Sequence, residues 1–99
     1  MKPTCYLVNT ARGQLIDETA LAHALDIGEL AGAALDVLER EPPSGSPLFG
    51  RDNVILSPHM SFYSVESLQE LQTRAAEEVA RALSGITPRN PINPAVLDR

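Results

Sequence analysis

An arginine, a histidine and a glutamate in this chain have side chains suited to chemistry on a small molecule that bears a carboxylate. Arg12 carries a fixed positive charge that can hold such a carboxylate. His59 can donate and accept a proton near neutral pH, and a neighbouring carboxylate would stabilise its protonated form and fix its tautomer. Glu41 is the candidate for that neighbour. These types suit a reaction that moves a hydride to or from a carbon while a proton moves at the attached oxygen.

Taken singly, each of these residues has an ordinary structural interpretation. Arg12 fits a solvated arginine in a turn, and a lone loop histidine such as His59 is more often hydrogen-bonded than catalytic. Glu39 lies in the same proline-rich loop as Glu41, and the loop alone does not distinguish between them. His23 falls on the polar side of a predicted helix and is interpreted as a surface residue.

The elements that must position these residues alternate between strand and helix patterns. Short apolar runs predict strands, amphipathic stretches with Asp17 and Ser64 as caps predict helices, and clustered Pro and Gly predict loops. The expected elements are a strand at 5–8, a helix from 17 to 28, a strand at 30–38, a loop at 39–52, a strand at 54–56 and a helix from 64 to about 84. The pattern predicts an α/β fold with a three-stranded parallel sheet of buried strands, of which the strand at 30–38 is covered on both faces, with a domain at 1–85 and an extended tail at 86–99.

Polar side chains follow all three predicted strands at the point where each strand ends. Residues 9–12 follow the first, Asp36 with Glu41 the second, and His59 the third. Open parallel sheets bind ligands beyond the carboxyl ends of their strands. We therefore expect an active site at this edge, with His59 and Glu41 within hydrogen-bonding reach and Arg12 facing the same cleft.

Composition excludes several other classes of function. The 99 residues carry a formal net charge of -5, which provides no basic footprint for nucleic acid or an anionic membrane. No apolar run approaches the roughly 18 residues of a membrane span. The single cysteine, Cys5, lies in an apolar run and fits a reducing compartment, so a cytoplasmic location is expected. No metal site is predicted.

Three segments together resemble the D-isomer-specific 2-hydroxyacid dehydrogenases. Residues 7–13 (LVNTARG) are similar to the family's arginine segment, residues 33–37 (AALDV) followed by Glu41-Pro42 to its glutamate segment, and residues 57–59 (SPH) to its histidine segment. The spacings also agree, and the likeness extends from Pro3 to Ser84. Agreement in three places is hard to obtain by chance. The resemblance implies a Rossmann-like fold, of which this chain would be the second half.

The resemblance also implies roles for individual residues. Arg12 would orient the substrate's carboxylate and carbonyl, His59 would be the general acid/base, and Glu41 would be its partner. Asp36 would hold the nicotinamide carboxamide, although it also fits a simple strand-end cap. Thr10 and Ala11 would line the nicotinamide end of NAD, with NADP not excluded. The substrate would be a small 2-hydroxy or 2-oxo acid.

The segment after His59 departs from the glycine-rich form of the phosphoglycerate dehydrogenases. Phe62 and Tyr63 resemble the aromatic pair of D-lactate dehydrogenases and of the C-terminal-binding-protein corepressors. Two classes of function therefore stay open, a dehydrogenase and a non-catalytic interaction or dinucleotide-sensing module of the corepressor type. The residues alone also favour packing as the role of both aromatic side chains.

The glycine-rich turn that binds a dinucleotide's pyrophosphate does not occur in these 99 residues. We therefore expect a fragment of a longer enzyme that binds NAD weakly and does not turn over alone. Its sheet edge and apolar surfaces would lack the neighbours that the family provides. A homodimer or larger homo-oligomer is the expected result.

Overall fold

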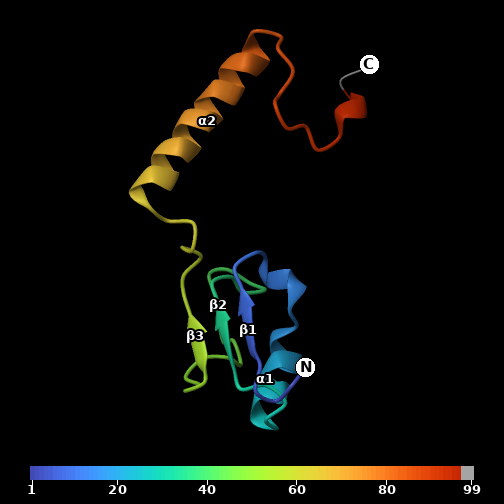
Figure 1. The fold of residues 1–99 in the computed structure, drawn as a ribbon, viewed down its shortest axis with the longest axis vertical. Coiled ribbons are helices and arrows are strands. Elements are labelled where there is room, and N and C mark those ends of the chain that lie inside the picture. Colours follow the sequence, from blue (N-terminus) through green and yellow to red (C-terminus); the bar gives the residue numbers. More distant parts are fainter. Residues whose placement is uncertain (97–99) are drawn as a thin grey trace. The chain divides into compact units, whose positions relative to one another are not determined.

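The fold is organised around three parallel strands in the order β1, β2, β3 (Figure 1). A computed structural model describes residues 1–96 of the chain. The strands are β1 at Tyr6–Asn9, β2 at Gly32–Leu35 and β3 at Val54–Leu56. Val8 pairs with Ala34, which in turn pairs with Ile55, so the three strands end in register. The predicted α/β fold with a three-stranded parallel sheet is confirmed.

The second strand is shorter than the predicted strand at 30–38. The backbone N–H of Asp36 still donates to Asn9, but the carbonyl of Asp36 accepts from the N–H of His59 at 2.8 Å, outside the ladder. Val37 and Leu38 are buried although they lie in the loop that follows. The apolar run therefore correctly marks burial, and it overestimates the length of the strand.

Helix α1, at Glu18–Asp26, covers one face of the sheet. Asp17 caps it by accepting a hydrogen bond from Ala20 N, as predicted, and Gly28 follows it with a φ of 72°. The apolar face of α1 shares one core with side chains from the sheet and from the loop after β2. That buried core consists of Leu21, Ala22, Leu25, Leu30, Ala33, Leu35, Leu38 and Leu48.

The opposite face of the sheet is exposed. Tyr6, Val8 and Ile55 point to this face and are 71%, 66% and 72% exposed. The prediction of buried strands is therefore wrong for this face of β1 and β3 in the described part of the chain, whereas most of β2, which was predicted to be covered on both faces, is buried. The expected bare apolar surface is present. Because side chains alternate along a strand, one covering helix can bury only every second residue.

Compact packing divides the chain into unit 1, Met1–Phe62, and unit 2, which begins at Tyr63. Unit 2 contains α2 at Val65–Leu83, which is capped by Ser64 in a reciprocal capping box with Ser67. The segment after α2 is tied to that helix by Arg89, which forms an ion pair with Glu77 at 2.7 Å. It ends in a short turn at Pro94–Val96, and the rest of the predicted tail lies outside the described residues. The predicted domain boundary at residue 85 falls inside unit 2.

Neither α1 nor α2 is long and apolar enough to cross a membrane, a finding that covers residues 1–96.

Candidate active site

His59 and Glu41 form a hydrogen-bonded pair in unit 1. His59 follows β3 and Glu41 lies in the loop after β2, and the ring Nδ1 of His59 is 2.8 Å from Oε2 of Glu41. Both side chains are partly open to solvent, at 44% and 38%. The predicted proximity of these two residues is confirmed. A ligand can therefore reach the pair.

The Glu41 carboxylate is held on both of its oxygens. Besides the bond to His59, its Oε1 accepts from the backbone N–H of Leu38 at 3.1 Å. The hydrogen bond from His59, followed by that from Leu38, lowers the pKa of Glu41 below its ordinary value. Glu41 therefore stays ionised at neutral pH. Because a carboxylate only accepts, Nδ1 carries the proton and Nε2 is the nitrogen that can exchange a proton with a ligand.

Asp36 fixes the loop that carries His59. Its buried carboxylate accepts from the hydroxyl of Ser57 and from the backbone N–H groups of Met60 and Ser61, each of these two at 2.9 Å. The Ser57 hydroxyl above all, and then the N–H groups of Ser61 and Met60, lower the pKa of Asp36 well below its ordinary range. These bonds hold the chain on both sides of His59. The backbone φ of His59 is 52°, in the left-handed region.

The contacts of Asp36 bear on its predicted role toward a nicotinamide. A carboxylate offers about four acceptor positions, and these contacts fill three of them, while the Ser61 side chain also acts on the carboxylate. The cofactor role of Asp36 stays a prediction. The structure gives this residue a second role, the positioning of the His59 loop.

The turn that carries Arg12 is built by Asn9 at the end of β1. The Nδ2 of this buried side chain donates to the carbonyl of Arg12 at 2.8 Å, and its Oδ1 accepts from Ala11 N at 3.0 Å. Thr10, Ala11 and Arg12 are exposed on the turn. The guanidinium of Arg12 donates from Nη1 to the carbonyl of Ala11 at 2.7 Å. These short-range bonds orient the turn.

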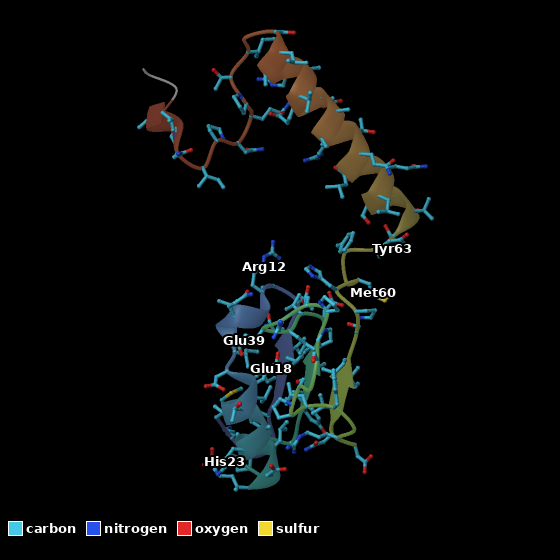
Figure 2. All side chains as sticks on the ribbon, turned by 180° about the vertical axis from the view of Figure 1, so that it is seen from behind. Arg12, Glu18, His23, Glu39, Met60 and Tyr63 are labelled. Atoms are coloured by element: carbon cyan, nitrogen blue, oxygen red, sulfur yellow. The ribbon has the colours of Figure 1, made fainter. Side chains whose placement is uncertain are left out.

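Arg12, Glu41 and His59 line one depression of about 380 Å³. Arg12 and Met60, which follows His59, lie at the same end of unit 1, whereas His23 lies at the other end (Figure 2). The prediction that Arg12 faces the same cleft as the pair is confirmed, and the surface position of His23 agrees with its interpretation. Arg40 also lines the depression and adds a second cation that the motif pattern did not indicate.

The structural roles of three residues in the site's architecture were not predicted from the sequence. Ser57 and Glu18 bind loop segments, and Asn9 was noted only as one of several polar residues at a strand end. The position of Ser57 just before Pro58 and His59 was a usable signal. Nothing distinguishes Glu18 from the acidic residues that commonly occupy the first turn of a helix.

Among residues 1–96 no group of His, Cys, Asp or Glu is arranged to hold a metal ion.

Comparison with known proteins shows which family the chain is similar to. The family model described as "D-isomer specific 2-hydroxyacid dehydrogenase, NAD binding domain" matches residues 1–61. The chain is 46% identical over 98 residues to a glyoxylate reductase of Thermofilum pendens, covering 98% of the chain and 29% of that relative. It therefore spans less than a third of that relative's length.

Two solved structures share the fold. The NADPH-dependent glyoxylate/hydroxypyruvate reductase of Sinorhizobium meliloti, in complex with NADP and malonate, superposes with a TM-score of 0.84 at 34% identity, over 92% of this chain and 28% of that one. A D-lactate dehydrogenase of Lactobacillus jensenii with NAD+ has a TM-score of 0.79 at 27% identity, over 93% and 32%. The aromatic pair after His59 therefore does not by itself assign the chain to the lactate branch.

The matched family model covers β1, α1, β2 and β3 together with the arginine, glutamate and histidine segments. On this match, and on the geometry of unit 1, the chain belongs to the D-isomer-specific 2-hydroxyacid dehydrogenases.

Proposed function

We propose that unit 1 supplies the acid/base and carboxylate-binding groups of an NAD(P)-dependent 2-hydroxyacid dehydrogenase. His59 is the general acid/base, Glu41 is its partner and Arg12 binds the substrate's carboxylate. One observation carries the proposal. The hydrogen bond of 2.8 Å between Nδ1 of His59 and Glu41 lies on the depression that Arg12 also lines.

The proposed chemistry is the reduction of a 2-oxo acid and its reversal. A bound nicotinamide supplies or accepts the hydride at the substrate's second carbon. His59 in its protonated form donates the Nε2 proton to the carbonyl oxygen, and the ionised Glu41 stabilises the imidazolium before the transfer. Arg12 neutralises the carboxylate and fixes the orientation of the carbonyl. In the reverse direction neutral His59 takes the proton from the hydroxyl.

The residues present fit the nicotinamide end of a dinucleotide. Thr10 and Ala11 are exposed beyond the end of β1, and Asp36 follows the end of β2 directly. The domain family binds NAD, and related structures hold NAD+ or NADP. We propose NAD, without excluding NADP, as the cofactor. With no glycine-rich turn in residues 1–99, binding to this chain alone should be weak, and calorimetry with NADH and NADPH measures it.

The substrate is proposed to be a small 2-oxo acid such as glyoxylate or hydroxypyruvate, on which related enzymes are named as acting. We further propose that residues 1–99 do not turn over alone and that the protein is cytoplasmic. The apolar sheet face supports a homodimer or larger homo-oligomer. Sedimentation equilibrium tests the assembly, and a single folded species near 10.7 kDa would contradict it.

A chimera provides the decisive test of function. In the glyoxylate reductase of Thermofilum pendens, the matching 98 residues are replaced by this chain, and consumption of NADH or NADPH is followed with glyoxylate and hydroxypyruvate. We expect activity. Glu41→Gln should lower kcat/KM by about 10²–10⁴, the usual range for disabled acid/base catalysis. Arg12→Ala should act mainly through KM because it removes a contact to the carboxylate.

Glu39→Gln is the matched control, since it neutralises the neighbouring glutamate without touching the bond to His59. It should leave kcat/KM within about twofold, a change well below the range for acid/base catalysis. Equal losses in the Glu39 and Glu41 variants would refute the assignment of Glu41. A correctly folded chimera with no activity toward any 2-oxo acid would refute the proposed function.

A further inference from the structure

Glu18, in the first turn of α1, is a buried carboxylate that plays no part in the proposed chemistry. It is only 9% exposed, and each of its two oxygens accepts a hydrogen bond. Oε1 accepts from the backbone N–H of Glu39 at 2.7 Å, and Oε2 accepts from the hydroxyl of Ser46 at 2.5 Å. A buried carboxylate is costly unless it is hydrogen-bonded, so these two bonds fix its place.

The two partners of Glu18 lie on either side of Glu41 in one loop. Glu39 precedes Glu41 by two residues and Ser46 follows it by five. The carbonyl of Glu39 is held separately by Nε2 of Gln14 at 3.2 Å. The peptide groups on both sides of Glu39 are thereby bonded to the segment that runs from β1 into α1. Their orientation sets the path of the chain into Glu41.

Close packing reinforces this arrangement at Gly13. A side chain there would place its Cβ 1.9 Å from the carbonyl oxygen of Leu38, so the backbone at Leu38 and Glu39 lies directly against Gly13. The N–H of Leu38 is the group that holds Oε1 of Glu41. The loop that carries Glu41 therefore packs against Gly13 at Leu38. Glu18 holds the same loop by hydrogen bonds at Glu39 and Ser46.

We infer that Glu18 is a positioning residue that sets Glu41 against His59 by holding both sides of the segment from Glu39 to Ser46. This inference rests on the proposed role of Glu41 as the partner of His59. Glu18 touches no substrate in this arrangement. It acts through the loop, because charge-assisted hydrogen bonds from a carboxylate to backbone N–H and hydroxyl groups are among the strong ones.

The test measures the pair directly and does not depend on turnover. In the full 99-residue chain, carboxyl ¹³C NMR follows the pKa of Glu41, and imidazole ¹⁵N NMR follows the Nδ1 proton of His59. The charged groups that act on Glu41 are His59, which lowers its pKa, and Asp36, which raises it. Neither group is altered in the variants, so a change reports the geometry of the loop.

Glu18→Ala removes both bonds, and we expect the pKa of Glu41 to rise toward that of an ordinary glutamate while the hydrogen-bonded Nδ1 signal of His59 is lost. Glu18→Gln should retain both features because its amide can accept from Glu39 N and donate to the Ser46 hydroxyl. Glu29→Ala, which removes an exposed carboxylate from the same unit, is the control for charge and should change neither signal.

Two results overturn the inference. One is a folded Glu18→Ala variant in which the pKa of Glu41 and the Nδ1 signal of His59 are the same as in the parent chain. The other is a Glu18→Gln variant that loses the pair as fully as Glu18→Ala. If Glu18→Ala does not fold, Ser46→Ala decides, since it removes one of the two bonds. It should shift the pKa of Glu41 in the same direction by less, and an unchanged value overturns the inference.

The proposed function fails or succeeds separately, in the dehydrogenase assay of the chimera. A chimera without activity would leave the NMR result for Glu18 standing as a statement about the Glu41 and His59 pair. An active chimera together with an unchanged Glu41 and His59 pair in Glu18→Ala would refute the positioning role of Glu18 and leave the proposed dehydrogenase function standing.

Discussion

In unit 1 the apolar side chains of α1, β2 and the following loop are buried together, whereas in unit 2 no residue of α2 is buried. Unit 1 also contains the bonds that join distant segments, such as Glu18 to Ser46 and Asp36 to Ser57. The bonds described in unit 2 join residues within one helix or link it to the adjacent segment. Among residues 1–96, the hydrogen bonds that join segments more than about 20 positions apart, and with them the candidate site, lie in unit 1.

The largest effect should come from opening the core of unit 1. Leu48 is 1% exposed, and Leu48→Ala should lower the free energy of unfolding by about 2–5 kcal/mol, because it removes buried methyl groups and leaves a cavity. Urea denaturation followed by the amide NMR signals of β2 measures the change. A difference below about 1 kcal/mol would mean that the loop collapses around the lost side chain and that unit 1 is less tightly packed than it appears.

Gly13→Ala should have a smaller effect on stability and a clear effect on the site. The added methyl meets the carbonyl of Leu38, so the backbone must move, at a cost of about 1–3 kcal/mol, and Glu41 should move with it. Gly45→Ala is the matched control, because Gly45 has open space around it and only its φ of 72° opposes a side chain. The Nδ1 signal of His59 should change in the first variant and persist in the second. Loss in both would indicate general loosening of the loop.

Acid should weaken unit 1 through its lowered carboxyl pKa values. Asp36 and Glu41 both have folded pKa values below their ordinary ones. The stabilisation they provide is therefore complete above the ordinary carboxyl range and is lost as the pH falls through their folded values. Asp36→Asn should make the fall in unfolding free energy with acid shallower, and Ser57→Ala should do so to a lesser degree. Urea titrations at successive pH values check this, and an unchanged slope in Asp36→Asn would count against it.

The smallest effect is expected in α2. Leu83 is 85% exposed, and Leu83→Ala should change the free energy of unfolding by no more than about 0.5 kcal/mol in dilute solution. The same urea experiment, read from the helical circular dichroism signal, measures it. A larger loss that grows with protein concentration would show that this face of α2 is buried in the proposed homo-oligomer, and the contrast between the units would then hold only for the monomer.

Local sequence signals predicted the helix ends well, because the contacts that end a helix are made within a few residues. The caps at Asp17 and Ser64 and the glycines at 28 and 85 mark helix ends through bonds made within a few residues. The strand at 30–38 was overestimated because apolar residues signal burial, and only the bond from His59 to the carbonyl of Asp36 shows where the ladder stops. Whether a strand is buried on both faces depends on neighbours that a local pattern does not contain.

For the site, the motif spacing predicted the pair of Glu41 and His59 and the shared cleft with Arg12. It could not predict the contacts that hold them. Glu18 bonds to residues 21 and 28 positions away, and no periodicity links a first-turn helix acid to a distant loop. Asp36 was expected to serve a ligand, and its bonds to the loop after β3 depend on how two strand ends meet in space.

The left-handed backbone at His59 restricts which residue types evolution or an engineer could place there. Apart from glycine, the side chains found most often with a positive φ are those of Asn, Asp and His, whereas β-branched residues are strained. Of these types only histidine has an ordinary pKa near neutrality. The positive φ at this position and the need for a side chain that exchanges protons near neutral pH therefore both favour histidine. Asn at this position is accordingly the substitution that should silence the proton transfer while leaving the loop's path intact.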